Sequence, residues 1–412
     1  MEKRSLTLKG INTVSIIHLI ISILVIVSSY LSLRHFFAAN FPTSIYDGSF
    51  CDISTFFNCD SSAYSFIAKI FDVPLGYFGM AIGLASLMGI IFPSAAFERT
   101  NIFLNFFNVL GIVGLIFISL FVLKSICLLC LAYYIFAFLN FWLYTRYGID
   151  SEKGFIRRHL QPNIRFLFGI GLLTVIGALN IYAFHHAKIE AQGGGVANRI
   201  VQQYFNLPKV KNPSIISPFY TVQATENFED APIRIVEWAD FQCPDCLKLR
   251  DDLEDLKEEF GDKMNIVFQF FPLDGKCNSV QEKNRHPQAC DLSFMSAFDP
   301  SKFLAIHDEI FDNFSKVRDT DWIKSLAQKY GVEEALTDEN TIKIVTDIID
   351  TGKEYRPTSD RFTYGIRSTP TMIINERMVI GTLPKVQLRA IFQAILDQKS
   401  KDEKTGFIED WR

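Results

Sequence analysis

The sequence predicts a multi-domain membrane protein, in which an all-α transmembrane four-helix bundle and a fifth tethering helix precede an α/β domain. Three observations predict it. Hydrophobic residues make up 49% of the 412 residues, and 39 residues are Phe. Long apolar runs lie before residue 185, and a soluble composition begins at Ala231. The eight cysteines fall into four near pairs, which indicates thiol chemistry in both parts.

Five apolar segments are long enough to cross a hydrocarbon core of about 30 Å. They are Ile11–Leu33, Val73–Phe92, Ile102–Leu123, Ile126–Tyr144 and Ile164–Phe184. Only Lys124 and Ser125 separate the third from the fourth, which predicts a tight helical hairpin. Between Phe166 and Phe184 the fifth carries no acidic or basic side chain, and it is expected to be a lipid-facing tether. The stretch 63–71 has a helical period but is too short to span, so a half-helix is expected there.

The basic residues of the short loops predict the orientation, because cytoplasmic loops are enriched in Lys and Arg. A cytoplasmic N-terminus places nine of them inside: Lys3, Arg4, Lys9, Arg99, Arg146, Lys153, Arg157, Arg158 and Arg165. Three remain outside: Arg34, Lys69 and Lys124. Five spans then place everything after Phe184 outside. All eight cysteines would face a compartment in which disulfides persist.

The Cys127-Leu128-Leu129-Cys130 motif opens the fourth span. Its two-residue spacer places both sulfurs on one side of a first helical turn, where the helix dipole and free N–H groups favour a thiolate. A dithiol bordering hydrocarbon needs a reaction partner that dissolves in lipid, and a quinone fits. The second such motif, Cys243 to Cys246, lies 112 residues away, so a shared zinc site is not expected and no metal is predicted.

Cys51 and Cys59 belong to the first outside loop and allow two interpretations. Their disulfide would staple the loop, or it would exchange with the membrane dithiol by thiolate attack.

The first part of the chain, from about Ile11 to Tyr147, resembles the vitamin K epoxide reductase family. The resemblance is carried by Cys51 and Cys59, by Ser65, by the Val73-Pro74-Leu75 entry with Gly79, and by Cys127-x-x-Cys130 followed by Tyr134. It implies a four-helix bundle around a quinone, ubiquinone or menaquinone. Cys130 would be the cysteine more apt to react with the quinone. Ser65, Tyr134, Pro74 and Phe78 would line the quinone pocket.

Beyond a Gly- and Pro-rich linker over 191–230, the chain reads as a soluble domain. A buried strand over 233–241 leads into Cys243-Pro244-Asp245-Cys246 and an amphipathic helix that ends at Phe260. A second strand over 265–271, helices near 288–298, 302–314, 321–330 and 339–351, a hairpin over 371–381 and a last helix from Lys385 follow. Residues 186–412 hold 29 basic and 37 acidic side chains, which excludes a nucleic-acid partner.

This domain resembles the thioredoxin superfamily, and its helical insertion and Phe-x-Cys-Pro-x-Cys sequence look DsbA-like. The resemblance implies that Cys243 is an exposed nucleophile and that Cys246 resolves the mixed disulfide. It also implies a cis Pro370, with Thr369 placing its backbone against the substrate. Cys277 and Cys290 lie in the insertion and are expected to form a structural disulfide, with a relay role as the alternative.

These expectations divide the chain into a quinone-reducing bundle (1–147), a fifth transmembrane helix with its flanks (148–190), a linker (191–230) and a periplasmic thioredoxin-like domain (231–412). The predicted protein lies in a bacterial inner membrane with the lipid bilayer, the quinone pool and reduced exported proteins as partners. Electrons from substrate thiols would pass through Cys243 and Cys246, the loop pair and the membrane pair to a quinone. The alternatives are an outward-delivering reductase or isomerase, and a thiol sensor whose bundle is a scaffold.

Overall fold

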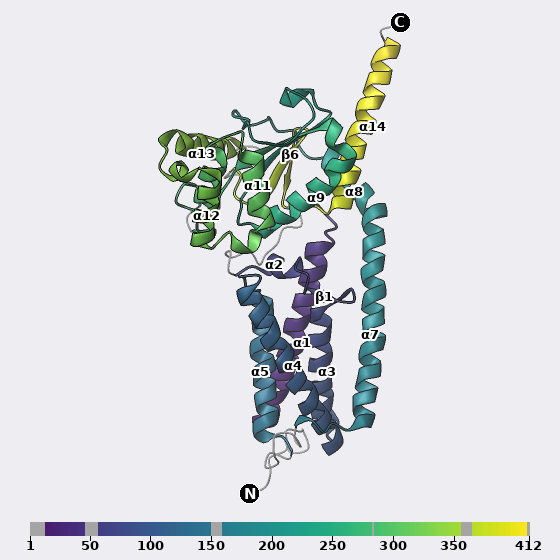
Figure 1. Ribbon diagram of the computed structural model, residues 1–412. Coiled ribbons are helices and arrows are strands. Elements are labelled where there is room, and N and C mark those ends of the chain that lie inside the picture. The colour runs from purple at the N-terminus through teal and green to yellow at the C-terminus, as the bar shows by residue number, and fades with distance from the viewer. Residues whose placement is uncertain (1–12, 46–56, 150–158, 282–283, 356–364, 410–412) are drawn as a thin grey trace. The chain divides into compact units, whose positions relative to one another are not determined.

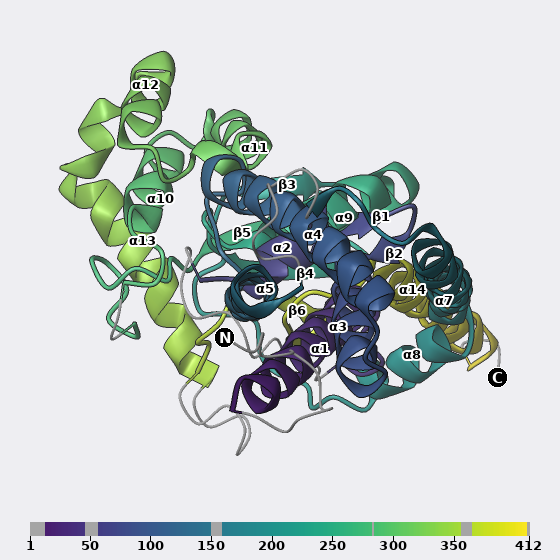
Figure 2. The same ribbon diagram turned by 90° about the horizontal axis from the view of Figure 1, so that it is seen from below.

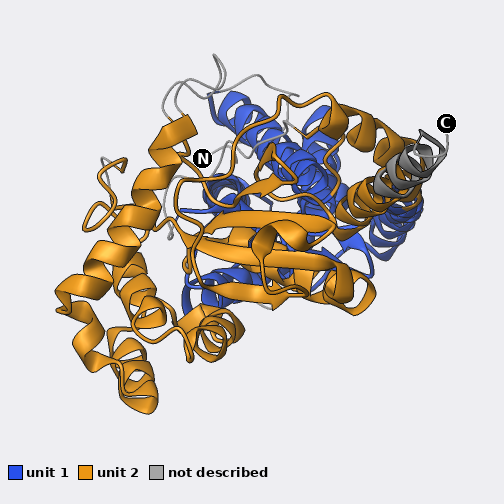
Figure 3. Cartoon of the chain, turned by 90° about the horizontal axis from the view of Figure 1, so that it is seen from above, with its two compact units in different colours: residues 1–40, 56–189 blue, residues 41–55, 190–412 orange. Residues whose placement is uncertain are grey.

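The computed structural model describes residues 13–45, 57–149, 159–281, 284–355 and 365–409, without the side chains of 399–409. It divides into two compact units, coloured separately in Figure 3. The membrane unit comprises Met1–Asn40 and Phe56–Ile189, and the thioredoxin-like unit comprises Phe41–Thr55 and Glu190–Arg412.

Apolar helices build the membrane unit. They are α1 (Thr13–Asn40), α3 (Leu75–Ile91), α4 (Ala95–Phe121), α5 (Leu128–Tyr147) and α7 (Ile164–Ala191). All but α3, which has 17 residues, are long and apolar enough to cross a membrane. The helices α1, α3, α4 and α5 run side by side, and α7 lies at the edge of the group (Figures 1 and 2). The hydroxyl of Tyr77 in α3 donates to the Thr174 carbonyl of α7 at 2.7 Å.

A helix occupies each of the five predicted segments, and local signals decide where each begins. The helix α4 begins seven residues earlier than predicted, because the Ser94 hydroxyl accepts the N–H of Phe97 at 3.1 Å and caps it. Lys124 adopts a positive φ of 50° in the tight turn between α4 and α5. The helix α3 begins only after β2 (Val73–Pro74), which pairs with β1 (Lys69–Ile70).

The half-helix predicted over 63–71 is wrong. The short helix α2 lies earlier, at Cys59–Ala63, because the Asn58 side chain accepts the N–H of Ser61 at 2.8 Å. The chain then turns into β1, and positive φ values at Phe71 and Asp72 reverse it into β2. The apolar period of this stretch therefore reflects a folded-back loop and not a helix.

A buried polar cluster joins the four bundle helices. The Asn140 amide of α5 donates to Ser86 of α3 and to Asn105 of α4, at 3.0 Å in both cases. Its oxygen lies 2.9 Å from Nε2 of His18 in α1. Because unpaired polar groups are costly in apolar surroundings, this cluster favours one register of the four helices.

The thioredoxin-like unit is built on a five-stranded sheet of order β3-β5-β4-β6-β7. The strands are β3 (Tyr220–Gln223), β4 (Ile233–Ala239), β5 (Met264–Phe270), β6 (Thr371–Ile374) and β7 (Arg377–Ile380). The central strands β4 and β5 are parallel, and the other pairs are antiparallel. This arrangement confirms the predicted α/β thioredoxin-like fold.

Each face of the sheet packs against helices, and alternate residues of β4 contribute to the two faces. Ile233 and Ile235 pack with α8 (Ala197–Phe205), α9 (Pro244–Phe260) and α14 (Lys385–Glu409). Val236 and Trp238 belong to the core on the other face. The helices there are α10 (Ala289–Ala297), α11 (Phe303–Asp312), α12 (Thr320–Tyr330) and α13 (Glu339–Thr351).

Much of the stretch expected as a linker over 191–230 is packed into this unit. Ile200 and Tyr204 of α8 are fully buried, and the Tyr204 hydroxyl donates to the Ile374 carbonyl of β6 at 2.8 Å. The strand β3, which the sequence analysis did not predict, adds an edge to the sheet by pairing with β5. The prolines of this stretch favour an extended chain, so the sequence did not indicate that α8 and β3 pack into the unit.

Candidate functional site

The structure brings Cys59 against the start of α5. The N–H of Asn58 donates to the carbonyl of Ile126 at 3.1 Å, and the hydroxyls of Ser125 and Ser61 lie 2.9 Å apart. These contacts hold the N-termini of α2 and α5 together. As a result, the Sγ atoms of Cys59 and Cys127 lie 3.2 Å apart, and both side chains are buried. Cys51, the other predicted loop cysteine, lies outside the described residues.

Cys127 and Cys130 have different surroundings although they share one helical turn. Cys127 is the N-cap of α5, and its sulfur accepts the N–H of Cys130 at 3.4 Å. Cys130 lies in the first turn and lines two adjoining cavities of the membrane unit. Cys127 therefore contacts the loop cysteine, whereas Cys130 borders the space inside the bundle.

The residues predicted to line a quinone pocket lie around these cavities. Ser65 and Pro74 line the smaller cavity, which has a volume of about 60 Å³ and also contacts Cys59 and Cys127. Phe78 lines the larger cavity of about 340 Å³. Tyr134 and Cys130 line both. The larger volume lies at the lower end of the range of about 300–1,000 Å³ that is usual for small-molecule sites.

A buried carboxylate–imidazole pair beside the cysteines was missed by the sequence analysis. Nε2 of His35 in α1 lies 3.1 Å from a carboxylate oxygen of Asp60 in α2, and both side chains are buried. His35 also lines the smaller cavity with Cys59 and Cys127. The position of Asp60, directly after Cys59, was an available signal. Nothing in the sequence around His35 indicates that it reaches this loop.

The Cys243-x-x-Cys246 motif opens α9, as predicted. Cys243 is the N-cap of this helix and Pro244 is its first residue. The sulfur of Cys243 contacts the carbonyl oxygen of Thr369 at 3.4 Å, and the Thr369–Pro370 peptide bond is cis, as predicted. Cys246 lies in the core, where burial raises the pKa of its thiol well above the usual value.

The exposed nucleophile expected at Cys243 is not found, because the Cys243 side chain is fully buried. Its sulfur lies at the start of α9 and contacts the Thr369 carbonyl oxygen. A protein substrate can therefore reach this sulfur only after it becomes exposed, because exchange requires contact with the sulfur.

A buried polar group lies behind the α9 dithiol. The N–H of Asp240 donates to the sulfur of Cys246 at 3.4 Å, and its carboxylate lies 2.9 Å from Nδ1 of His286. The same carboxylate accepts the N–H groups of Gln242 and Leu273 at 2.6 Å. Burial lowers the pKa of the nearby Arg318 to about 10. Asp240 thus connects the dithiol to the loop that carries Cys277.

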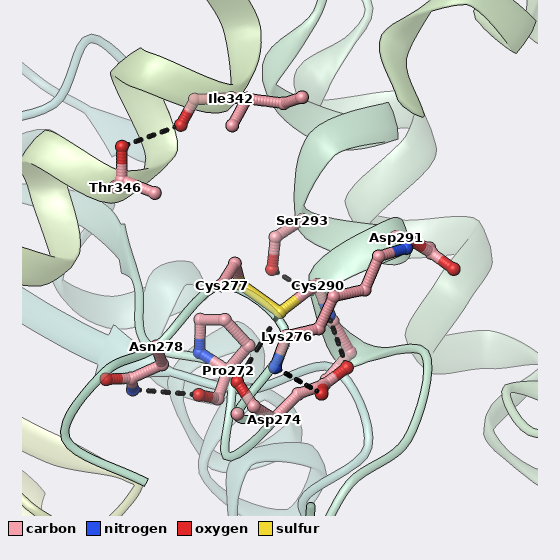
Figure 4. Close-up of a disulfide and its surroundings, with 12 residues drawn as sticks. Pro272, Asp274, Lys276, Cys277, Asn278, Cys290, Asp291, Ser293, Ile342 and Thr346 are labelled. Atoms are coloured by element: carbon pink, nitrogen blue, oxygen red, sulfur yellow. Dashed lines mark hydrogen bonds and ion pairs between the residues drawn. A yellow bond between two sulfur atoms is a disulfide. The ribbon is translucent and has the colours of Figure 1, made fainter. Parts of the chain in front are cut away.

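Cys277 and Cys290 form a disulfide in this insertion (Figure 4). Beside it, Lys276 pairs with Asp291, and the Asn278 amide donates to the Pro272 carbonyl at 2.8 Å. The bridge thus anchors the loop after β5 to the first turn of α10. Among the residues that the structure describes, no group of three or more His, Cys, Asp or Glu side chains could hold a metal ion.

Replacing both Cys277 and Cys290 with Ser is expected to lower the free energy of unfolding of the thioredoxin-like unit by about 3 kcal/mol, because the bridge closes a short loop. For a unit of this size, the loss corresponds to a fall in Tm of about 6–12 °C. Calorimetry of the full chain measures it. Reduced wild-type protein should show the same fall, and an unchanged Tm in the double variant would contradict a stabilising role.

Each of the two units is similar to a known protein family. A family model described as vitamin K epoxide reductase family matches residues 15–145, and one described as thioredoxin matches residues 228–394. A probable disulfide bond formation protein D of Bacillus anthracis is 28% identical over 155 residues, which are 37% of this chain and 61% of that protein.

Two further similarities were found. The Na(+)/H(+) antiporter NhaA 1 of Mycolicibacterium vanbaalenii is 26% identical over 151 residues, and the match covers 35% of this chain but only 22% of that protein. The crystal structure of a periplasmic thioredoxin-like protein from Salmonella enterica serovar Typhimurium aligns with a TM-score of 0.34 and 19% identity, over 44% of this chain and 92% of that one.

Proposed function

We propose that this chain, which joins a vitamin K epoxide reductase domain to a thioredoxin-like domain, forms disulfides in exported proteins and passes the electrons to a quinone. The family matches support a thiol–disulfide oxidoreductase. The observation that carries the finer proposal is the 3.2 Å separation of the Cys59 and Cys127 sulfurs, one helical turn from a Cys130 that lines an apolar cavity.

The reaction begins at the α9 dithiol. A substrate thiolate attacks the Cys243–Cys246 disulfide, and a second substrate thiolate resolves the mixed disulfide. The substrate is released with a disulfide, and Cys243 and Cys246 remain in the protein as two thiols. The high pKa of Cys246 favours its protonated thiol, so Cys246 retains its proton until the next exchange.

The electrons then cross two thiol pairs. The reduced α9 dithiol reduces Cys51 and Cys59, and the Cys59 thiolate attacks the Cys127 sulfur of an oxidised Cys127–Cys130 pair. The contact between Cys59 and Cys127 supports this choice of sulfur, because exchange requires the attacking sulfur to reach the bond. Cys127 serves exchange, and Cys130 is left to serve the electron acceptor.

The acceptor is a quinone, ubiquinone or menaquinone, drawn from the membrane as a substrate. It takes two electrons and the two thiol protons, so that a dithiol and a quinone become a disulfide and a quinol. The residues around the larger cavity fit such a ring, because they are mostly apolar and include the Cys130 sulfur. The proposed lining residues are Phe78 and Tyr134 of this cavity, together with Ser65 and Pro74 of the smaller cavity, which adjoins it at Cys130.

The proposed location is a bacterial inner membrane, with a cytoplasmic N-terminus and a periplasmic thioredoxin-like domain. The excess of basic residues in the segments assigned to the cytoplasmic side, nine against three outside, supports this orientation. The start of α4 contacts the segment after α5 through Glu98 and Ile149 and the start of α7 through Thr100 and Asn163. Arg99, Arg146 and Arg165, three of these nine residues, therefore lie at one end of the membrane unit. The helix α2 lies at the other end (Figure 1).

The purified full chain is expected to oxidise a reduced two-cysteine peptide anaerobically only when ubiquinone-1 or menadione is added, with one quinone consumed per disulfide formed. Peptide thiols and quinone absorbance are measured together. The Cys277→Ser/Cys290→Ser variant should keep this stoichiometry. Oxidation at an equal rate without quinone would contradict the proposal, and peptide reduction by added quinol would favour a reductase.

A further inference from the structure

The larger cavity of the membrane unit is apolar apart from a few groups. It lies between α1, α3, α4 and α5 and is lined chiefly by aliphatic and phenylalanine side chains. Its polar lining comes from Ser29, Ser32, Asn108, Tyr133 and Tyr134, together with the Cys130 thiol. A ligand of this cavity is therefore largely hydrophobic, and the few polar groups decide how it is oriented.

Asn108 and Tyr133 form a defined pair in this lining. The Tyr133 hydroxyl of α5 donates to the Oδ1 atom of Asn108 in α4 at 2.6 Å. This bond sets the orientation of the amide, because only its oxygen can accept a proton from Tyr133. The Nδ2 atom of Asn108 is buried and has no hydrogen-bond partner in the described part of the chain.

The position of the Tyr133 ring depends on Gly79 of α3. A methyl group at Gly79 would lie 2.8 Å from the Cε2 atom of Tyr133 and 2.9 Å from its Cζ atom. The absence of a side chain thus allows the ring to lie against α3, in the place from which its hydroxyl reaches Asn108. Three helices contribute to the placing of one amide.

Burial of an amide N–H without a hydrogen-bond partner is energetically unfavourable, so binding of a ligand that offers an acceptor at this place is favoured. We propose that the Nδ2 atom of Asn108 donates a hydrogen bond to a carbonyl oxygen of a quinone whose ring lies in the larger cavity beside Cys130, and that Tyr133 is the positioning residue that orients the amide. This inference rests on the proposed function.

The chemistry of the acceptor gives this hydrogen bond a function. Negative charge develops on the carbonyl oxygens as a quinone accepts electrons, and a fixed donor aimed at one of them stabilises that charge. The donor is also neutral, so it adds no charge to the apolar part of the bundle. Ligands of the same size that lack a carbonyl oxygen are not favoured.

The test compares full-length wild-type protein with Asn108→Leu and Tyr133→Phe variants, using ubiquinone-1 labelled with ¹³C at its carbonyl carbons. In wild-type protein the carbonyl band of bound ubiquinone-1 should lie at lower frequency than in hydrocarbon. In Asn108→Leu the carbonyl band should return to its frequency in hydrocarbon. The Kd for ubiquinone-1 should rise about tenfold, which corresponds to the loss of one hydrogen bond. Tyr133→Phe should broaden the band, because the amide is no longer held.

Asn180→Leu in α7 is the matched control, since Asn180 is exposed and its amide donates to Ile176 of the same helix. It should change neither the band nor the Kd. An unchanged band and Kd in Asn108→Leu and Tyr133→Phe would overturn this inference alone. Failure of wild-type protein to bind ubiquinone-1 would overturn the proposed acceptor and this inference together.

Discussion

A Cys130→Ser variant is expected to lose quinone reduction by about three orders of magnitude or more, the loss seen when a reacting nucleophile is removed. Cys130 is the cysteine that lines both cavities, whereas Cys127 contacts Cys59. Removing Cys130 therefore separates electron delivery from exchange. The rate of ubiquinone-1 reduction by a reduced peptide measures the loss.

The same variant should trap one step of the exchange. In this variant the Cys127 thiolate can run the proposed exchange in reverse, since it can attack a Cys51–Cys59 disulfide at Cys59 and release the Cys51 thiol. With no thiol at position 130, the Cys59–Cys127 bond is opened only by return of Cys51, and acid quenching stops that return. A Cys59–Cys127 cross-link should accumulate and be found by mass spectrometry of acid-quenched protein. A variant that reduces quinone at the full rate would contradict the assignment of Cys130, and a cross-link between Cys51 and Cys127 would contradict that of Cys59.

Glu237→Gln is expected to stabilise the thioredoxin-like unit at neutral pH. Glu237 lies on the central strand β4, and burial raises the pKa of its carboxyl from 4.5 to about 8. Between these values the folded state keeps a proton that the unfolded state has released. The contribution of the protonated Glu237 carboxyl to the free energy of unfolding is therefore fully present below pH 4.5 and is lost as the pH rises toward 8.

Between pH 5 and pH 7.5 the ionisation of this carboxyl should lower the free energy of unfolding of wild-type protein by about 3 kcal/mol. The Gln variant has no such ionisable group and should not show this decrease. The expected difference in Tm is about 6–12 °C at pH 7.5 and close to zero at pH 5. Calorimetry of the full chain at both values checks it. Glu254→Gln, at an exposed position of α9, is the control and should show no such pH-dependent difference. Equal Tm values for Glu237→Gln and wild-type protein at pH 7.5 would contradict the prediction.

The proposed function gives the two cysteines of one helical turn different roles, thiol exchange for Cys127 and electron transfer to the quinone for Cys130. Cys127 caps α5 and meets the loop, and Cys130 borders the apolar space. A dithiol placed in this way can accept electrons from the loop cysteine at one sulfur and pass them on to a lipid-soluble acceptor at the other. The two-residue spacer alone creates the pair, and the neighbours of each sulfur create the asymmetry.

Local signals predicted much of the fold. The apolar runs identified each membrane helix, and the strand before Cys243 with the amphipathic helix behind it identified the thioredoxin-like unit. Boundaries were less predictable, because Ser94 and Asn58 set them through caps that apolar periodicity does not register. The strand β3 and the packing of α8 were not predicted, because the prolines between them favour an extended linker.

The candidate site was predictable as a set of residue types but not as an arrangement. Ser65, Pro74, Phe78 and Tyr134 do line the cavities beside Cys130. Four residues of the site were not predicted, because each matters only through a partner on another helix: His35, Asp60, Asn108 and Tyr133. The exposure expected of Cys243 was wrong, and its sulfur contacts the carbonyl of a residue more than a hundred positions further along the chain.

The sequence by itself determined the division into an apolar and a soluble part, the four thiol pairs and the helix starts that carry two of them, since these follow from hydrophobicity and from residues close together in the chain. The tertiary structure alone decided which sulfur meets Cys59, which amide faces the cavity and which cysteine is covered. These contacts join residues 25 to 126 positions apart in the chain, and the packing of whole helices selects them.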